Sequence, residues 1–198
     1  MPITYTNRKD RTYHLCQGLT KTGKPRYYFA REPRDTPVEE IPEGYEIRES
    51  ANGTVSLGKV RAILLLGEEI DAVNKAVQAH PEAKNYRVEV KPKQIIIHER
   101  FGPDFSEVLE ILAPDLVMPS LSSDRMRQLE EVDRMHAPYS PALRFVLKDA
   151  QNRRFGAQRL CLLNGTYDWM DIAYDDPLAD LVAAMVPTLG TDEFFELM

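Results

Sequence analysis

Residues 143–162 decide the fold, and they read LRFVLKDAQNRRFGAQRLCL. The segments 143–148 and 154–162 have the aliphatic and aromatic content of β-strands, and the polar residues 149–152 between them are typical of a turn. Strands joined by so short a turn pair antiparallel, because parallel strands need a long crossover. Residues 167–173 predict a third strand next to this hairpin.

Further strands and helices are predicted upstream and downstream. Residues 87–91 alternate between apolar and charged, which indicates a strand with one face in water, and residues 95–97 predict a more buried neighbour. Apolar residues at helical spacing predict four helices. These helices begin near Gly67, Asp104, Ser123 and Asp176.

Three of these helices carry specific predictions. In the second helix, Asp104 and Glu107 have the spacing of a capping box. In the third, Val132 is expected to face inward together with Met126 and Leu129. In the last, Asp176 is expected to cap the N-terminus, with Pro177 as the first helical residue.

The first 58 residues predict two β-hairpins. Strands over residues 12–16 and 26–31 flank a longer loop, and strands over residues 45–48 and 54–57 flank Asn52-Gly53, which suits the positive φ angles of a type I′ turn. Because the strands come in hairpin-like groups, the chain is expected to be α+β. We predict a β-rich N-terminal hairpin module with a basic face over residues 1–58. A body with a mixed antiparallel sheet and about four to five helices follows over residues 59–198.

Composition and charge restrict the class of protein. The chain has 198 residues, and 43% of them are hydrophobic, which is enough to form a core. Its net charge of −6 is uneven, because the first 35 residues carry +5 and the remainder −11. Such asymmetry suggests an anionic partner for the basic end, or attraction between the two ends.

The sequence contains no targeting or membrane signal. No apolar run approaches the ~20 residues of a membrane span, and the first residues lack the apolar segment of a signal peptide. Cys16 and Cys161 are too few for a disulfide framework. We therefore expect a cytoplasmic protein that does not bind membranes.

Residues 18–25, GLTKTGKP, match the glycine and lysine spacing of a phosphate-binding loop. That loop needs a serine or threonine at its eighth position and a helix directly after it. Here the eighth residue is Pro25, and strand-like sequence follows. We interpret the segment as a hairpin loop.

Glu89 and Lys91 on one strand have the Glu-x-Lys spacing of metal-dependent nucleases, in which a carboxylate holds the ion and a lysine stabilises phosphate charge. No aspartate precedes them at a suitable spacing, and any half-exposed strand shows the same alternation. A metal-dependent hydrolase or nuclease therefore stays a second alternative.

Metal binding has little support in the spacing of other residues. Five aspartates between residues 168 and 180 form an acidic cluster that lacks the alternating ligands of a calcium loop, so we interpret it as solvated. We interpret Trp169, which lies within this segment, as a core or interface anchor. His and Cys residues form no two close pairs of the zinc type. We predict no metal site and no cofactor, although cation binding by the acidic cluster stays open. The acidic cluster is Asp168, Asp171, Asp175, Asp176 and Asp180, and the His and Cys residues are His14, Cys16, His98, His136 and Cys161.

Three N-terminal motifs carry a resemblance: residues 5–8 (YTNR), 20–29 (TKTGKPRYYF) and 41–47 (IPEGYEI). This segment resembles one shared by uncharacterised bacterial proteins. The likeness covers the first 58 residues best and is weaker at residues 143–147 and 168–169. It implies a bacterial, intracellular origin and carries no catalytic residue.

The basic, aromatic N-terminal hairpin is the candidate binding surface. Its cations can contact phosphates while its tyrosines stack on bases, as in proteins that bind single strands. The candidate contact residues are Arg8, Arg11, Lys21, Lys24, Arg26, Arg31, Tyr13 and Tyr28.

The residues do not assemble a nucleophile, a base and an orienting group. The leading interpretation is therefore a protein that binds an unknown protein partner or itself, supported by the apolar tail at residues 194–198. Nucleic-acid binding through the basic hairpin is the first alternative.

Overall fold

The computed structural model describes residues 1–33, 35–103, 108, 123–163 and 165–197. Over these residues the chain has eleven strands, all paired antiparallel, and four α-helices, so the predicted α+β class is confirmed. The chain divides into two compact units. Unit 1 comprises Met1–Val60 and Gly102–Pro138, and unit 2 comprises Arg61–Phe101 and Tyr139–Met198.

Unit 1 contains a sheet in which β2 (Thr12–Leu19) is central. On one side β2 pairs with β3 (Pro25–Ala30), which confirms the first hairpin. On the other side it pairs with β1 (Thr4–Thr6) and β4 (Thr36–Pro37). The loop between β2 and β3 turns at Gly23, where φ is +77°, and leads directly into a strand. The hairpin-loop interpretation of this segment is thus confirmed.

The second predicted hairpin of unit 1 is also present, but its turn differs from the prediction. Strands β5 (Tyr45–Glu49) and β6 (Val55–Lys59) pair antiparallel. Gly53 has a positive φ of +76°, whereas Asn52 does not, so the turn is not type I′. The Ser50 N–H donates to the Thr54 carbonyl and closes a three-residue loop, in which one left-handed glycine is sufficient.

Unit 1 also contains α3 (Ser123–His136), at the position predicted. The predicted orientation of Val132 is wrong, because this side chain is 51% exposed, and Met126 and Leu129 are only half-buried. The capping box of Asp104 and Glu107 lies outside the described residues.

Unit 2 is built on a five-stranded antiparallel sheet in the order β11-β10-β9-β8-β7. The hairpin of residues 143–162 forms its centre and confirms the prediction, although each strand is longer than expected. The strands are β7 (Tyr86–Lys91), β8 (Gln94–Arg100), β9 (Tyr139–Asp149), β10 (Arg154–Leu163) and β11 (Thr166–Pro177).

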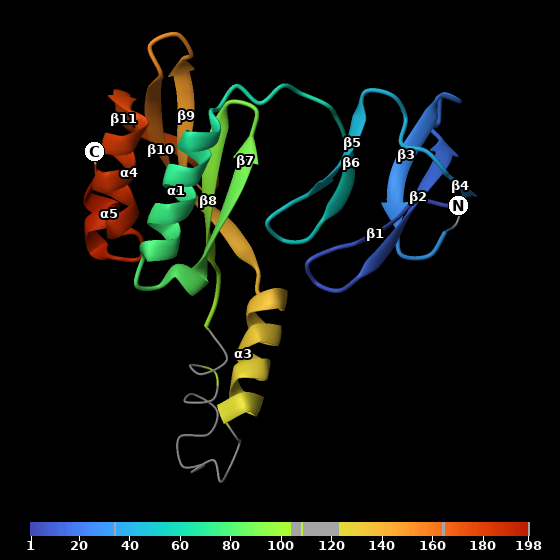
Figure 1. Ribbon diagram of the computed structural model, residues 1–198, viewed down its shortest axis with the longest axis horizontal. Coiled ribbons are helices and arrows are strands. Elements are labelled where there is room, and N and C mark those ends of the chain that lie inside the picture. The colour runs from blue at the N-terminus through green and yellow to red at the C-terminus, as the bar shows by residue number, and fades with distance from the viewer. Residues whose placement is uncertain (34, 104–107, 109–122, 164, 198) are drawn as a thin grey trace. The chain divides into compact units, whose positions relative to one another are not determined.

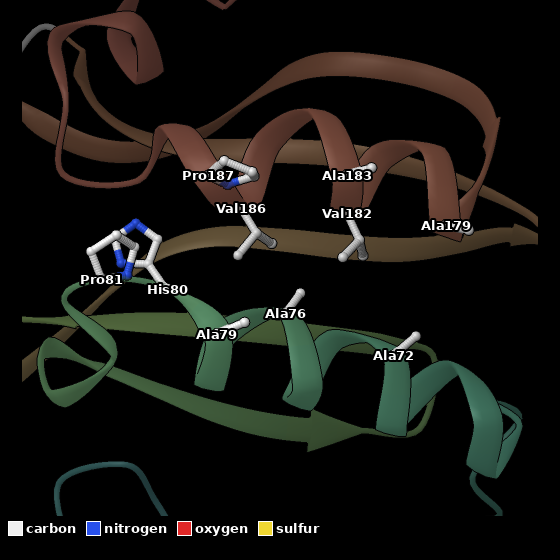
Figure 2. Close-up of a pocket in the computed structure, with 10 residues that line it drawn as sticks. All are labelled: Ala72, Ala76, Ala79, His80, Pro81, Ala179, Val182, Ala183, Val186 and Pro187. Carbon is white, nitrogen blue, oxygen red and sulfur yellow. The ribbon is translucent and has the colours of Figure 1, made fainter.

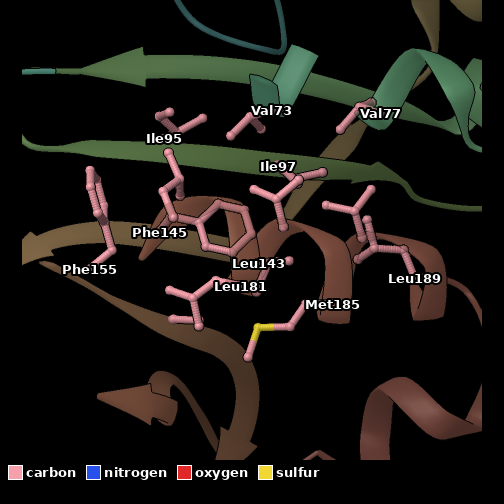
Figure 3. Close-up of a cluster of buried hydrophobic side chains, with 14 of the residues drawn as sticks. Val73, Val77, Ile95, Ile97, Leu143, Phe145, Phe155, Leu181, Met185 and Leu189 are labelled. Atoms are coloured by element: carbon pink, nitrogen blue, oxygen red, sulfur yellow. The ribbon is translucent and has the colours of Figure 1, made fainter. Parts of the chain in front are cut away.

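Helices α1 (Gly67–Ala79) and α4 (Leu178–Met185) cover one face of this sheet, followed by the short α5 (Asp192–Glu196) (Figure 1). Alternate strand residues point toward them and form the core with the buried sides of the helices (Figure 3). The largest fully buried side chains of this core are Ile95, Ile97, Leu143, Phe145 and Phe155. The other alternate residues therefore point to the opposite face.

The start of α4 corrects one prediction. Asp176 and Pro177 belong to β11, where they pair with Phe155 and Arg154 of β10. The sheet thus holds both residues extended, and the helix begins one residue later, at Leu178, without a side-chain cap. The buried stripe of α4, which begins at Leu178, is as predicted.

None of the helices in the described part of the chain is both long and apolar enough to cross a membrane.

Candidate functional site

The fold separates the predicted contact residues of unit 1 into two groups. Arg8 and Arg11 lie at the β1–β2 turn, whereas Lys21, Lys24 and Arg26 lie at or beside the β2–β3 turn. These turns are at opposite ends of β2, about 23 Å apart at ~3.3 Å per residue. The remaining cation, Arg31, follows β3 at the Arg11 end. The eight predicted residues therefore do not form one patch.

Arg8 is neutralised inside unit 1. Its Nε lies 2.7 Å from Glu49 Oε1, and its backbone N–H donates to the same oxygen at 3.0 Å. The Tyr5 hydroxyl donates to Glu49 Oε2 at 2.9 Å, and the Glu49 side chain is only 10% exposed. Burial alone would raise the pKa of Glu49, but these donors and the Arg8 charge lower it. Arg8 therefore supports the fold of unit 1.

The β2–β3 turn carries the cations that stay available. Lys21, Lys24 and Arg26 are exposed, and none forms an ion pair within the part of the chain that the structure describes. We call these three residues the hairpin tip. The Tyr28 hydroxyl donates to the carboxylate of Asp35, which raises the pKa of Tyr28. Tyr13 lies on the other face of the sheet, because the β2 partner of Tyr28 is Cys16. The two tyrosines thus cannot serve one surface.

The second candidate surface is the face of the unit 2 sheet that points away from α1 and α4. We call it the open face. It carries five Lys or Arg residues against two acidic ones, in a chain whose net charge is negative. Sequence reasoning missed it, although charged residues at alternate positions of residues 87–91 were a signal. Its charged and aromatic members are Arg87, Glu89, Lys91, His98, Arg100, Tyr139, Arg144, Lys148, Tyr167, Trp169 and Asp171.

Arg144 lies at the centre of the open face and is fixed by three neighbours. Its guanidinium carbon lies 4.1 Å from the centre of the Trp169 ring, a cation–π contact. Its Nε donates to Gln158 Oε1 at 2.6 Å, and Nη1 donates to Gln94 Oε1 at 3.5 Å. Partial burial lowers the pKa of Arg144, although an arginine stays charged at neutral pH. Both acceptors are neutral amides, so no carboxylate of the described residues bonds Arg144, and Asp171 and Asp168 act on it only through their charge.

The nearest acid on the open face is occupied. Asp171 Oδ1 accepts a bond from Gln158 Nε2 at 2.8 Å and lies 3.8 Å from Lys148 Nζ. Gln158 therefore connects Arg144 and Asp171 without bringing them into direct contact.

Glu89 and Lys91, the pair considered for a nuclease, also lie on the open face. Glu89 Oε2 lies 2.9 Å from His98 Nε2 and 3.5 Å from Lys91 Nζ, and the hydrogen bond from His98 lowers the pKa of Glu89. His98 Nδ1 is buried and has no hydrogen-bond partner among the residues that the structure describes. No group of three or more potential metal ligands occurs among the described residues, and this includes the acidic cluster and the His and Cys residues considered above. No observation therefore favours the nuclease alternative.

Large apolar side chains are exposed at the β10–β11 end of the open face. Leu162 and Tyr167 are cross-strand partners and are 61% and 73% exposed. The next pair along the strands on the same face is Leu160 and Trp169. We call these four residues the β10–β11 strip. Adjacent exposed apolar side chains of this size are typical of a contact surface.

Two apolar residues of the C-terminal tail, Phe194 and Leu197, lie in or pack against the core, so the tail is not one exposed apolar segment over its described residues. Phe194 is 3% exposed, and its carbonyl accepts a bond from the buried Arg159. Phe195 is exposed, but alone it is not an apolar patch.

An apolar groove of about 520 Å³ lies between α1 and α4 (Figure 2). Alanines from both helices line it, together with Val182, Val186 and, at one end, His80. The His80 Nδ1 accepts the Glu82 N–H, so this ring is already engaged. The groove is the helical seam of unit 2 and carries no converging polar groups.

No family model matches the chain, and neither a curated protein nor a solved structure matches it.

Proposed function

We propose that this chain is a binding protein whose open face recognises a protein partner, with the β10–β11 strip as the apolar contact. The observation that carries the proposal is the exposed pair Leu162 and Tyr167, which lies next along the strands to Trp169, the residue that Arg144 contacts. Protein interfaces combine a small apolar centre, aromatic residues and arginine in this way. We further propose that it acts in the cytoplasm.

A double change of the strip tests the proposal. In Leu162→Ser/Tyr167→Ser, both side chains lose apolar contact area but are too exposed to support the fold. We expect capture of a specific partner, or self-association in light scattering, to fall at least about tenfold.

The matched control is Leu19→Ser, which removes a 73% exposed leucine from unit 1. This variant should capture the same partner as the unchanged chain. Equal capture by the strip variant would contradict the proposal, as would a strictly monomeric chain without any specific partner.

One observation favours a second candidate, single-stranded nucleic acid bound by the hairpin tip. Lys21, Lys24 and Arg26 are three exposed cations without a bonded carboxylate among the described residues. With three phosphate contacts, the logarithm of the binding constant for an oligothymidine should fall with the logarithm of the salt concentration at a slope of about −2.

The double change Lys24→Glu/Arg26→Glu should abolish this binding, while the matched change of the exposed Lys75 to Glu should not. Binding that is absent, or that does not respond to salt, would remove the second candidate.

A further inference from the structure

We infer that Arg144 is a receptor for a carboxylate group of the partner. The inference rests on the proposed function and names the chemistry that the open face recognises. Arg144 stands beside the exposed β10–β11 strip, so one ligand can contact both.

The guanidinium of Arg144 is positioned before any ligand arrives. Its guanidinium carbon lies 4.1 Å from the centre of the Trp169 ring, and the amide oxygens of Gln158 and Gln94 accept two of its N–H groups. A side chain that is already ordered loses little conformational freedom on binding. This arrangement therefore favours recognition with defined geometry.

Arg144 also has unused hydrogen-bonding capacity. A guanidinium has five N–H donors, and only the bonds to Gln158 and Gln94 are present among the described residues. Nη2 has no partner among the described residues and is not buried, so its two N–H groups reach solvent. A carboxylate can accept two parallel bonds from such a fork.

The charges around Arg144 favour an anion. Lys91 and Lys148 lie on the same face and are 43% and 41% exposed. The two acids of the face, Glu89 and Asp171, are each paired with one of these lysines, and each accepts a hydrogen bond from another side chain. The open face as a whole thus keeps an excess of positive charge, while the charges of Asp171 and Asp168 both act on Arg144.

The apolar surroundings favour a protein segment over nucleic acid. One face of the Trp169 ring is covered by Arg144 and is therefore closed to a base. Its neighbours on the strip are Leu160 and Leu162, which suit an apolar side chain next to the carboxylate. The ligand is thus the C-terminal carboxylate of an apolar residue, or the carboxylate of an acidic residue that has an apolar neighbour.

Trp169 provides the test, because it is the only tryptophan of the chain. Its fluorescence is titrated with N-acetylphenylalanine, which resembles a chain end, and with N-acetyl-glutamyl-phenylalaninamide, which offers an acidic side chain. N-acetylphenylalaninamide is the neutral control. We expect a saturable change with at least one acid, at an affinity about tenfold above that of the neutral amide.

Arg144→Gln should reduce this preference to less than twofold, and Arg144→Lys, which keeps the charge but lacks the fork, should give an intermediate value. The control Arg127→Gln, on an exposed helix position, should keep the full preference. If circular dichroism shows that Arg144→Gln does not fold, the preference of Arg144→Lys for the acids over the neutral amide is the deciding measurement.

Several results would overturn the inference: no saturable change, equal affinity for acid and amide, or a preference unchanged by both Arg144 variants. A response confined to inorganic phosphate or oligothymidine would assign the site to phosphate instead. Partner capture that is lost in Leu162→Ser/Tyr167→Ser but unchanged in Arg144→Gln would leave the proposed function standing and refute only the carboxylate receptor. Arg144-dependent binding of the acids, together with unchanged partner capture by Leu162→Ser/Tyr167→Ser, would refute the proposed function and leave the carboxylate receptor standing.

Discussion

Arg8 in unit 1 and Arg144 in unit 2 are both fixed by neighbouring side chains, but their acceptors differ. Arg8 bonds the buried carboxylate of Glu49, so the charge is neutralised within the unit. Arg144 bonds neutral amides and makes a cation–π contact with Trp169, so it is held without a bonded carboxylate among the described residues. The type of acceptor, more than exposure, thus distinguishes the arginine whose charge is neutralised within the fold from the arginine whose charge is not.

The largest expected effect follows from removing the carboxylate that neutralises Arg8. Glu49→Ala should lower the free energy of unfolding by about 2–3 kcal/mol, because Tyr5 and Arg8 both lose their acceptor in a mostly buried place. Urea denaturation measures this. The control Glu43→Ala, at an exposed position, should change stability by less than about 0.5 kcal/mol. Equal losses for the two variants would mean that Arg8 does not support unit 1.

A smaller loss of stability is expected on the open face. Arg144→Ala should cost about 1 kcal/mol in the same measurement, because Gln158 and Gln94 can bond water instead. A loss as large as that of Glu49→Ala would indicate that Arg144 has a structural role, and the comparison between the two arginines would then fail.

Acid should affect both units through carboxylates whose pKa is depressed in the folded state. Glu49 and Glu89 each have a pKa below the ordinary value of 4.5. Their stabilisation is therefore complete above pH 4.5 and is lost as the pH falls through the folded pKa. Glu89→Gln should make the decline of unfolding free energy below pH 4.5 less steep, whereas Glu131→Gln on the exposed side of α3 should not. An unchanged decline in Glu89→Gln would exclude this contribution.

The smallest effect is expected at the hairpin tip. Lys24→Glu/Arg26→Glu should change the free energy of unfolding by less than about 0.5 kcal/mol, because neither side chain has an acidic partner among the described residues. Thermal denaturation at matched salt measures this. A loss above about 1 kcal/mol would show that the tip supports unit 1 and is not free for a ligand.

Local pattern predicted most of the fold. Alternation and turn residues located the hairpins at residues 12–31, 45–57 and 143–162, because these signals depend on neighbours in sequence. The start of α4 could not be predicted locally, since pairing with β10 keeps Asp176 and Pro177 extended. The turn at Asn52 likewise depends on loop length, and not on the residue pair alone.

The candidate site was harder to predict than the fold. The positive charges of residues 8–31 are visible in the sequence, but only pairing shows that β2 separates them and that Glu49 neutralises Arg8. Arg144, Gln158 and Trp169 come from three strands and meet only through the register of β9, β10 and β11. Such a site depends on how the strands pair, and the periodicity within a single strand does not predict that pairing.

Hydrogen–deuterium exchange of the full chain, with and without a captured partner, tests the central claim most directly. We predict slower exchange in residues 158–171, around Arg144 and the β10–β11 strip, with residues 19–26 of unit 1 unchanged. Slower exchange confined to residues 19–26, with the open face unchanged, would contradict the claim.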